Sequence, residues 1–127
     1  MMFYDDSKAT NIAAVARALE SFDKPVSLIM GGRDKGGDYL ILKNAVKKHV
    51  KKLVVIGEAK EKIISALGDT VNTEQVSTIE AAVSTAYKAA KSGDVVLLSP
   101  ACSSFDMFKS YKERGNRFRM AARSLVP

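Results

Sequence analysis

Three short segments of the 127-residue sequence place charged, hydroxyl and glycine residues directly after apolar runs. They are DDSKATN (residues 5–11), GGRDKGGD (31–38) and SPACSSFDMF (99–108). Each segment leads into a stretch with a helical pattern. Lysine ammonium groups, hydroxyl groups and the free N–H groups at a helix N-terminus all bind carboxylates and phosphates. The residue types therefore predict a site for an anionic ligand.

Each of the three segments also has a purely structural interpretation. In GGRDKGGD the glycines would permit a tight turn, and Asp38 would cap a helix. That interpretation does not explain Lys35, a cation within a glycine-rich turn. The pattern is neither the G-x-x-x-x-G-K-[ST] of a P-loop nor the G-x-G-x-x-G of a dinucleotide-binding loop. In the other two segments the alternative is helix capping, by Ser7, Thr10 or Asn11 and by Ser103 or Ser104.

The composition narrows the class of protein. Hydrophobic residues make up 46% of the chain, as in a packed domain, and the sequence holds no uninterrupted apolar run of the ~18 residues that a membrane span needs. Cys102 is the one cysteine and His49 the one histidine, so we expect no internal disulfide and no metal site. The N-terminus also lacks the pattern of a secretory signal. A single domain in a reducing compartment is the expectation.

The net charge of +6 favours an anionic partner, and the basic residues are densest in KKHVKK, residues 47–52. This run follows a helical pattern, and lysines near a helix C-terminus suit the helix dipole while remaining solvated. Its sequence contains no aromatic residue on which a base could stack. We therefore expect neither a nucleic acid nor a membrane as partner.

Strand-like and helix-like patterns alternate along the chain. Continuous apolar runs, which are typical of strands buried on both faces of a sheet, occur at 26–30, 52–57 and 95–100, with weaker candidates at 1–4 and 70–76. Helical spacing of apolar residues follows at 12–19, 79–86 and 118–125, with a capping box predicted from Ser77 and Glu80. Gly68, Gly93 and Gly115 are expected to end helices. The alternation predicts one α/β domain with a three-layer, mainly parallel, Rossmann-like sheet.

Ligands of such sheets bind at the carboxyl ends of the strands. The three polar segments all begin where an expected strand ends, at residues 5, 31 and 99. We therefore expect Thr10, Lys35 and Ser104 to face a common cleft. Cys102 is expected to be a small buried residue. We do not expect it to be a nucleophile, because no histidine lies near it in the sequence to act as a base.

The segments DDSKATN, GGRDKGGD and LLSPACSSFDMFKSYKERGNRF closely resemble the carboxy-terminal domain of the Mur ligases of bacterial peptidoglycan synthesis. The resemblance keeps the same order from about Tyr4 to Leu125. The D-S-K-A-T-N stretch is the discriminating part, because other Mur ligases carry D-Y-A-H-type or D-x-Y-N-A-N-P-type sequences there. It resembles the branch of the family that adds D-glutamate.

The resemblance implies a three-domain, ATP-dependent ligase. One domain holds UDP-N-acetylmuramoyl-L-alanine, a central ATPase domain uses ATP and Mg²⁺, and the carboxy-terminal domain binds D-glutamate and closes over ATP. Neither of the first two domains is found within residues 1–127, and the sequence has no P-loop. On this reading the chain is a single carboxy-terminal domain, monomeric, from the bacterial cytoplasm, and inactive as a ligase on its own.

The resemblance also implies roles for individual residues. Thr10, Lys35, Ser104 and Phe105 match positions that hold D-glutamate, as does Tyr111, where the family often has phenylalanine. The residue chemistry agrees, because a lysine and hydroxyl groups can bind the two carboxylates of D-glutamate.

On the nucleotide side, Asp6 matches a position near the ribose and Lys8 one near the terminal phosphate of ATP. Lys8 would act catalytically by stabilising charge on the transferred phosphoryl group. No metal ligand is implied in this domain.

Two alternatives stay open from the sequence. One is a free-standing α/β module that binds a nucleotide or a small acid without ligase activity. The other, which rests only on the positive charge, is a nucleic-acid-binding domain. Steep salt dependence of oligonucleotide binding would favour the latter.

Overall fold

A computed structural model of the chain describes residues 2–6, 11–33, 36–102 and 110–125. Within these residues five strands form one sheet in the order β1-β5-β2-β3-β4, and every described pairing is parallel. The expected α/β architecture with a mainly parallel sheet is confirmed. The strands are β1 (Met2–Asp5), β2 (Val26–Gly31), β3 (Val50–Ile56), β4 (Asn72–Gln75) and β5 (Val95–Leu98).

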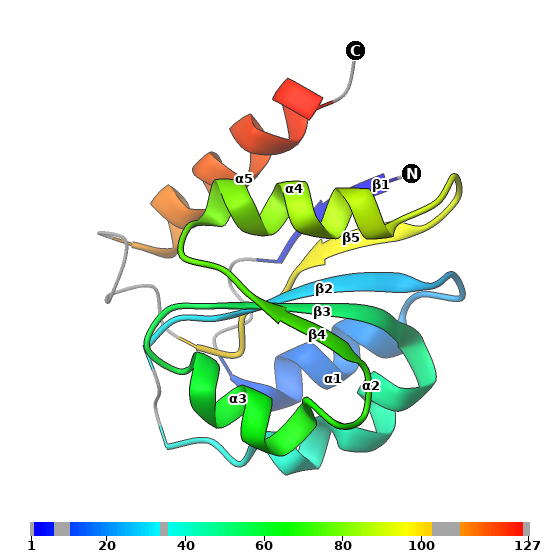
Figure 1. Ribbon diagram of the computed structural model, residues 1–127, viewed down its shortest axis with the longest axis vertical. Helices are drawn as coiled ribbons and strands as arrows, with labels where there is room; N and C mark the ends of the chain where they lie inside the picture. Colours follow the sequence, from blue (N-terminus) through cyan, green and yellow to red (C-terminus); the bar gives the residue numbers. More distant parts are fainter. Residues whose placement is uncertain (1, 7–10, 34–35, 103–109, 126–127) are drawn as a thin grey trace.

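Helices cover both faces of this sheet and complete three layers (Figure 1). One face is covered by α1 (Ile12–Glu20), α2 (Lys43–His49) and α3 (Lys60–Leu67), together with the short 3₁₀ helix η1 (Tyr39–Leu42). The other face is covered by α4 (Ile79–Ala89) and α5 (Tyr111–Leu125). The two layers follow from the strand order, because right-handed crossovers that run in opposite directions along a sheet lie on opposite faces.

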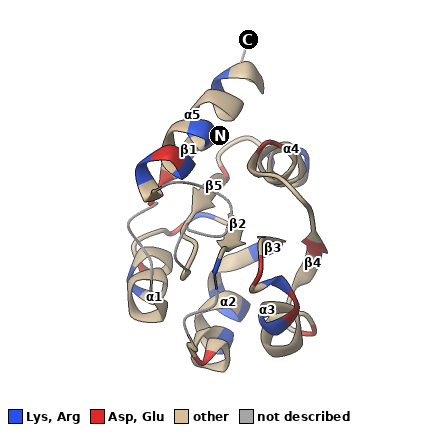
Figure 2. Ribbon diagram, turned by 90° about the vertical axis from the view of Figure 1, so that its left-hand side faces the viewer, with Lys and Arg blue, Asp and Glu red and all other residues tan. Residues whose placement is uncertain are grey.

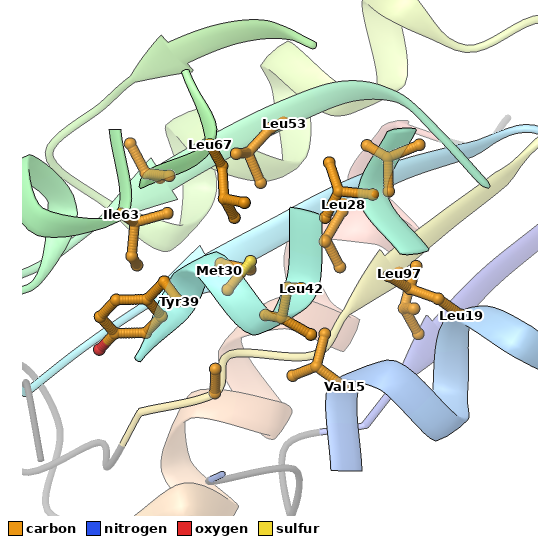
Figure 3. Close-up of a cluster of buried hydrophobic side chains, with 14 of the residues drawn as sticks. Val15, Leu19, Leu28, Met30, Tyr39, Leu42, Leu53, Ile63, Leu67 and Leu97 are labelled. Atoms are coloured by element: carbon orange, nitrogen blue, oxygen red, sulfur yellow. The ribbon is translucent and has the colours of Figure 1, made fainter. Parts of the chain in front are cut away.

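The sheet separates two hydrophobic clusters. β2 is buried at every position, so alternate residues of its apolar run enter opposite clusters. Leu28 and Met30 pack with α1, α2, α3 and η1, as Figure 3 shows, whereas Ile29 packs with α4 and α5. The continuous apolar runs of the sequence therefore mark strands buried on both faces, as expected.

Two local expectations are wrong. The N-cap of α4 is Thr78 and not Ser77, because the Thr78 hydroxyl accepts a hydrogen bond from Ala81 N at 3.0 Å. Gly115 lies buried inside α5 and does not end a helix. A single glycine in a helix costs only about 1 kcal/mol, and the buried residues Phe118 and Ala122 hold α5 against the sheet.

The basic run 47–52 is divided between two elements. α2 ends at His49, and β3 begins at Val50, two residues before the expected start. Lys51 Nζ then donates to Asp94 Oδ2 at 2.8 Å, and Lys52 Nζ to Glu74 Oε1 at 3.3 Å. The bond from Lys51 lowers the pKa of Asp94 below its ordinary value, and a bond from the backbone N–H of Lys91 adds to this. Lys52 thus links β3 to its neighbour β4, and Lys51 links β3 to the residue that precedes β5.

Gly31 ends β2 at a place where the chain approaches β3 closely. Its φ angle is +131°, and a Cβ atom there would lie 1.9 Å from the carbonyl oxygen of Ile56. Its own N–H donates to the carbonyl of Pro100 at 3.0 Å. Glycine is thus required at this position by the backbone itself.

Gly31→Ala should lower the free energy of unfolding of the chain by about 3 kcal/mol or more, because the neighbouring backbone cannot move aside. Gly36→Ala is the matched control. Gly36 has a φ of +79° but no atom within 4 Å of the added Cβ, so only conformational strain of about 1–2 kcal/mol is expected. Urea denaturation of both variants measures the difference. Equal losses would show that the contact with β3 is not the constraint.

Candidate functional site

The carboxyl ends of β1, β5 and β2 lie together at one edge of the sheet. The helices α1 and η1, which follow β1 and β2 in the sequence, lie on one face, whereas α5, which follows β5, lies on the other face. Such a divergence opens a crevice at the strand ends, where ligands of open α/β sheets bind. A cleft of about 640 Å³ lies here between the end of β1 and the first turns of α5. Its lining is Asp5, Asp6, Tyr111, Lys112, Gly115, Asn116 and Arg119.

The described wall of this cleft is polar and carries both signs of charge. Figure 2 shows acidic and basic residues together where α5 passes β1. Arg119 forms an ion pair with Asp5 and also contacts the side-chain oxygen of Asn116. Lys112, Asn116 and Arg119 are spaced four and three residues apart, which places them on one side of the helix. This spacing is the sequence signal that could have identified them.

Asp6 is fixed across the pairing of β1 with β5. Its N–H donates to Leu98 O at 2.8 Å, and its Oδ2 accepts from the Ser99 hydroxyl at 3.0 Å. Partial burial raises the pKa of the Asp6 carboxyl above its ordinary value, although the bond from Ser99 acts in the opposite direction. The Asp6 carboxyl group is thus fixed at the end of β1, where partial burial disfavours its ionised form.

Asp6 and Tyr111 are the two predicted site residues that the structure describes, and both line this cleft. Lys8, Thr10, Lys35, Ser104 and Phe105 lie outside the described residues, so their expected convergence stays a prediction. The described ends of the segments do lie at the same edge. Ser99 N donates to Ile29 O at 3.2 Å, which keeps the ends of β5 and β2 together.

Helix capping accounts for part of two segments. The Asn11 side chain accepts from Ala14 N at 2.9 Å and caps α1, whereas Asp38 accepts from Leu40 N at 3.1 Å and caps η1. The structural interpretation of these two residues is therefore confirmed. It does not extend to Asp6 or Tyr111, which line the cleft.

Neither a metal centre nor a membrane span is found in the part of the chain that the structure describes. No group of three or more His, Cys, Asp or Glu side chains there could hold a metal ion. None of the described helices is both long enough and apolar enough to cross a bilayer.

Comparison with known proteins decides the family. A family model described as Mur ligase, glutamate ligase domain, matches residues 1–102. The chain belongs to this family. Its Mur ligase relatives include the UDP-N-acetylmuramoylalanine–D-glutamate ligase of Geotalea daltonii, 54% identical over 124 residues, which are 98% of this chain and 27% of that protein. The ligase of the same name from Salinibacter ruber is 50% identical over 127 residues, 99% of this chain and 28% of that protein. The resemblance stated from the three segments is confirmed.

This chain spans about a quarter of the length of these curated relatives. Solved structures agree on the fold. A murein peptide ligase from Psychrobacter arcticus superposes with a TM-score of 0.57 at 13% identity, over 91% of this chain and 26% of that one. A domain from a Haemophilus ducreyi protein, described as a putative UDP-N-acetylmuramate:L-alanyl-gamma-D-glutamyl-medo-diaminopimelate ligase, gives 0.53 at 10% identity, over 98% and 87%. At these identities the likeness shows the α/β fold alone.

Because the pKa of Asp6 is raised, ionisation of its carboxyl group is expected to destabilise the folded chain. The folded chain holds the Asp6 proton to a higher pH than the unfolded chain, so stability is lost as the pH rises through the folded pKa. Asp6→Asn keeps an acceptor for Ser99 but carries no charge. The stability of this variant relative to the unmodified chain should therefore increase between about pH 3 and pH 7.

Urea denaturation of both chains across this range measures the difference, and Asp23→Asn, at an exposed site in the turn between α1 and β2, is the control. A difference that stayed constant with pH would show that the charge of Asp6 carries no cost.

Proposed function

We propose that residues 1–127 form the carboxy-terminal, amino-acid-binding domain of a UDP-N-acetylmuramoylalanine–D-glutamate ligase. The observation that carries this proposal is the identity of about half of all residues, over nearly the whole chain, with relatives of that name. The polar cleft between the end of β1 and α5 supports it, because two residues assigned from the resemblance line it. The amino-terminal and central domains would belong to the rest of the protein.

The reaction has two steps in the full-length enzyme. The γ-phosphoryl group of ATP is transferred to the terminal carboxylate of UDP-N-acetylmuramoyl-L-alanine, which gives an acyl phosphate and ADP. The amino group of D-glutamate then attacks the acyl carbon, and phosphate leaves as the amide forms. The main contribution of this domain is to orient the amine towards a short-lived intermediate.

D-glutamate presents two carboxylates, so its site needs cations and hydroxyl donors. Lys35 supplies the point charge, and Thr10 and Ser104 supply hydroxyl groups. Phe105 and Tyr111 complete the set with aromatic rings. Tyr111 stands at the start of α5 on the wall of the cleft, which fits a position beside the amino acid.

The nucleotide would lie on the β1 side of the cleft. The Asp6 carboxylate, held by Ser99, is suited to accept hydrogen bonds from ribose hydroxyls. Lys8, two residues further along the chain, would stabilise the charge of the transferred phosphoryl group.

The described residues do not fit a Mg²⁺ site. Asp5 and Asp6, the two carboxylates in the cleft, are engaged by Arg119 and by Ser99. The Mg²⁺ that accompanies ATP would therefore be held by the central domain. It follows that the chain alone should neither ligate D-glutamate nor hydrolyse ATP. We place the enzyme, as a monomer, in the bacterial cytoplasm, where ATP is available.

Lys35→Ala in the full-length ligase should lower kcat/KM for D-glutamate roughly 30- to 150-fold. This factor corresponds to about 2–3 kcal/mol, as for a hydrogen bond to a charged group. The effect should fall mainly on KM for D-glutamate and less on KM for ATP, because the lysine would contact the amino acid. Steady-state kinetics with each substrate varied in turn measures both constants.

Arg33→Ala is the matched control, since Arg33 is an exposed cation of the same segment. It should leave both KM values unchanged. A folded Lys35→Ala enzyme with unchanged kinetics for D-glutamate would contradict the assignment. So would an equal loss in the Arg33 variant.

A further inference from the structure

A buried contact joins two of the three polar segments. Tyr39 Oη and Cys102 Sγ lie 3.1 Å apart, 63 residues apart in sequence, and either atom can donate the hydrogen. Tyr39 directly follows the glycine-rich segment 31–38 and begins η1. Cys102 belongs to segment 99–108, after β5. Both residues are almost fully excluded from solvent, so the contact is formed inside the protein.

Cys102 is also contacted from the helix layer on the opposite face of the sheet. Arg114, in the first turn of α5, donates from a terminal guanidinium nitrogen to the carbonyl oxygen of Cys102 at 3.2 Å. Its side chain has no exposed surface. Burying a cation is unfavourable unless acceptors compensate, and an aliphatic residue would fill the same space without that cost. The Cys102 carbonyl is one of the acceptors that compensate this buried charge.

The backbone next to Cys102 adopts an unfavourable conformation. Ala101 has a φ angle of +64°, a left-handed conformation that is unfavourable for a residue with a Cβ atom. Such a conformation persists when the surroundings fix it. The thiol contact from Tyr39 and the carbonyl contact from Arg114 both act on the next residue, Cys102.

Packing of the hydrophobic cluster does not require the hydroxyl group of Tyr39. Figure 3 shows Tyr39 at one end of the hydrophobic cluster, with its hydroxyl oxygen directed away from the labelled aliphatic side chains. A phenylalanine ring would fill the same part of the cluster. It would also keep the contact of the ring with Lys62, whose Nζ lies 5.8 Å from the ring centroid. The Tyr39 hydroxyl thus contributes something other than burial of the ring.

We propose that Tyr39, Cys102 and Arg114 form a positioning clamp that fixes residues 99–102, the described start of segment 99–108, relative to Tyr39, which directly follows the glycine-rich segment 31–38. The inference rests on the proposed function, in which the two segments carry Ser104 and Lys35 as contacts to D-glutamate. The clamp residues do not touch the substrate. They hold the described ends of the two segments together, and so control affinity for D-glutamate more than affinity for ATP.

The first experiment tests the clamp in the chain itself. Tyr39→Phe, Cys102→Ala and the double variant are unfolded with urea, and the changes in the folding equilibrium constant are compared. The double variant should be less destabilised than the product of the single effects predicts, by about threefold or more, as expected for one shared hydrogen bond.

Tyr87→Phe combined with Cys102→Ala is the matched cycle. Tyr87 stacks against Phe3 on the opposite face of the sheet, so its effect should multiply independently with that of Cys102→Ala. A Tyr39 cycle with no more coupling than the Tyr87 cycle would overturn the clamp.

The second experiment tests its function in the full-length ligase. Tyr39→Phe and Cys102→Ala should each raise KM for D-glutamate about three- to tenfold, with KM for ATP little changed, because the loss of one hydrogen bond shifts an equilibrium by about this factor. Cys102→Ser keeps a group that can hydrogen-bond the Tyr39 hydroxyl, and should restore KM for D-glutamate towards the original value. A merely structural role would move both KM values together.

The outcomes separate the clamp from the proposed function. An unmodified enzyme that ligates no D-glutamate would overturn the proposed function. A normal unmodified enzyme whose KM for D-glutamate is unchanged in Tyr39→Phe would overturn the clamp alone. Tyr39→Phe carries the test if the Cys102 variants fold poorly, because it removes one oxygen atom and leaves the ring in place.

Discussion

The parallel pairing of β2 with β5 on one side and with β3 on the other is the constraint on which the structure depends. A parallel sheet must be covered on both faces, which explains the apolar runs at residues 28–30 of β2, 53–56 of β3 and 95–98 of β5. It also brings the carboxyl end of every strand to one edge. The strand order then reverses after β4, so that α4 and α5 cover the face opposite to α1, α2 and α3. The crevice between the two layers is a consequence of this reversal.

Features that are unfavourable for stability gather at this edge. They are the positive φ of Ala101, the buried guanidinium of Arg114 and the raised pKa of Asp6. At the opposite edge the same kinds of group support folding, since Lys51 lowers the pKa of Asp94 just before β5. Natural proteins retain locally unfavourable groups mainly at functional sites. The contrast between Asp6 and Asp94 therefore agrees with a ligand site at the carboxyl edge.

The fold could be predicted from sequence because it depends on local patterns. Apolar runs identified the strands to within a few residues, and the burial of Cys102 followed from its type. The same reliance on local patterns explains why two predicted helix ends were wrong. Ser77 and Thr78 are both good caps, and only the path of the chain into α4 selects Thr78. Gly115 carries a helix-ending residue type, but packing keeps α5 continuous through it.

The candidate site could be predicted in part. Asp6 and Tyr111 were assigned through the resemblance, and both line the cleft. The pairs Asp5–Arg119 and Tyr39–Cys102 were not predicted, because they join residues 114 and 63 positions apart and no local spacing encodes them. Only the parallel sheet brings these residues together. Long-range polar contacts of this kind decide how the strand ends are arranged, and they require the structure.

We propose that this chain supplies the D-glutamate site of a Mur ligase. The most direct test replaces the carboxy-terminal quarter of the Geotalea daltonii ligase, the part that this chain matches at 54% identity, with residues 1–127. Amide formation from UDP-N-acetylmuramoyl-L-alanine and ATP is then measured with D-glutamate and with L-glutamate, beside the host truncated at the junction. We expect amide formation with D-glutamate, little with L-glutamate, and none in the truncated host. A folded exchange enzyme that binds ATP but forms no amide at saturating D-glutamate would contradict it.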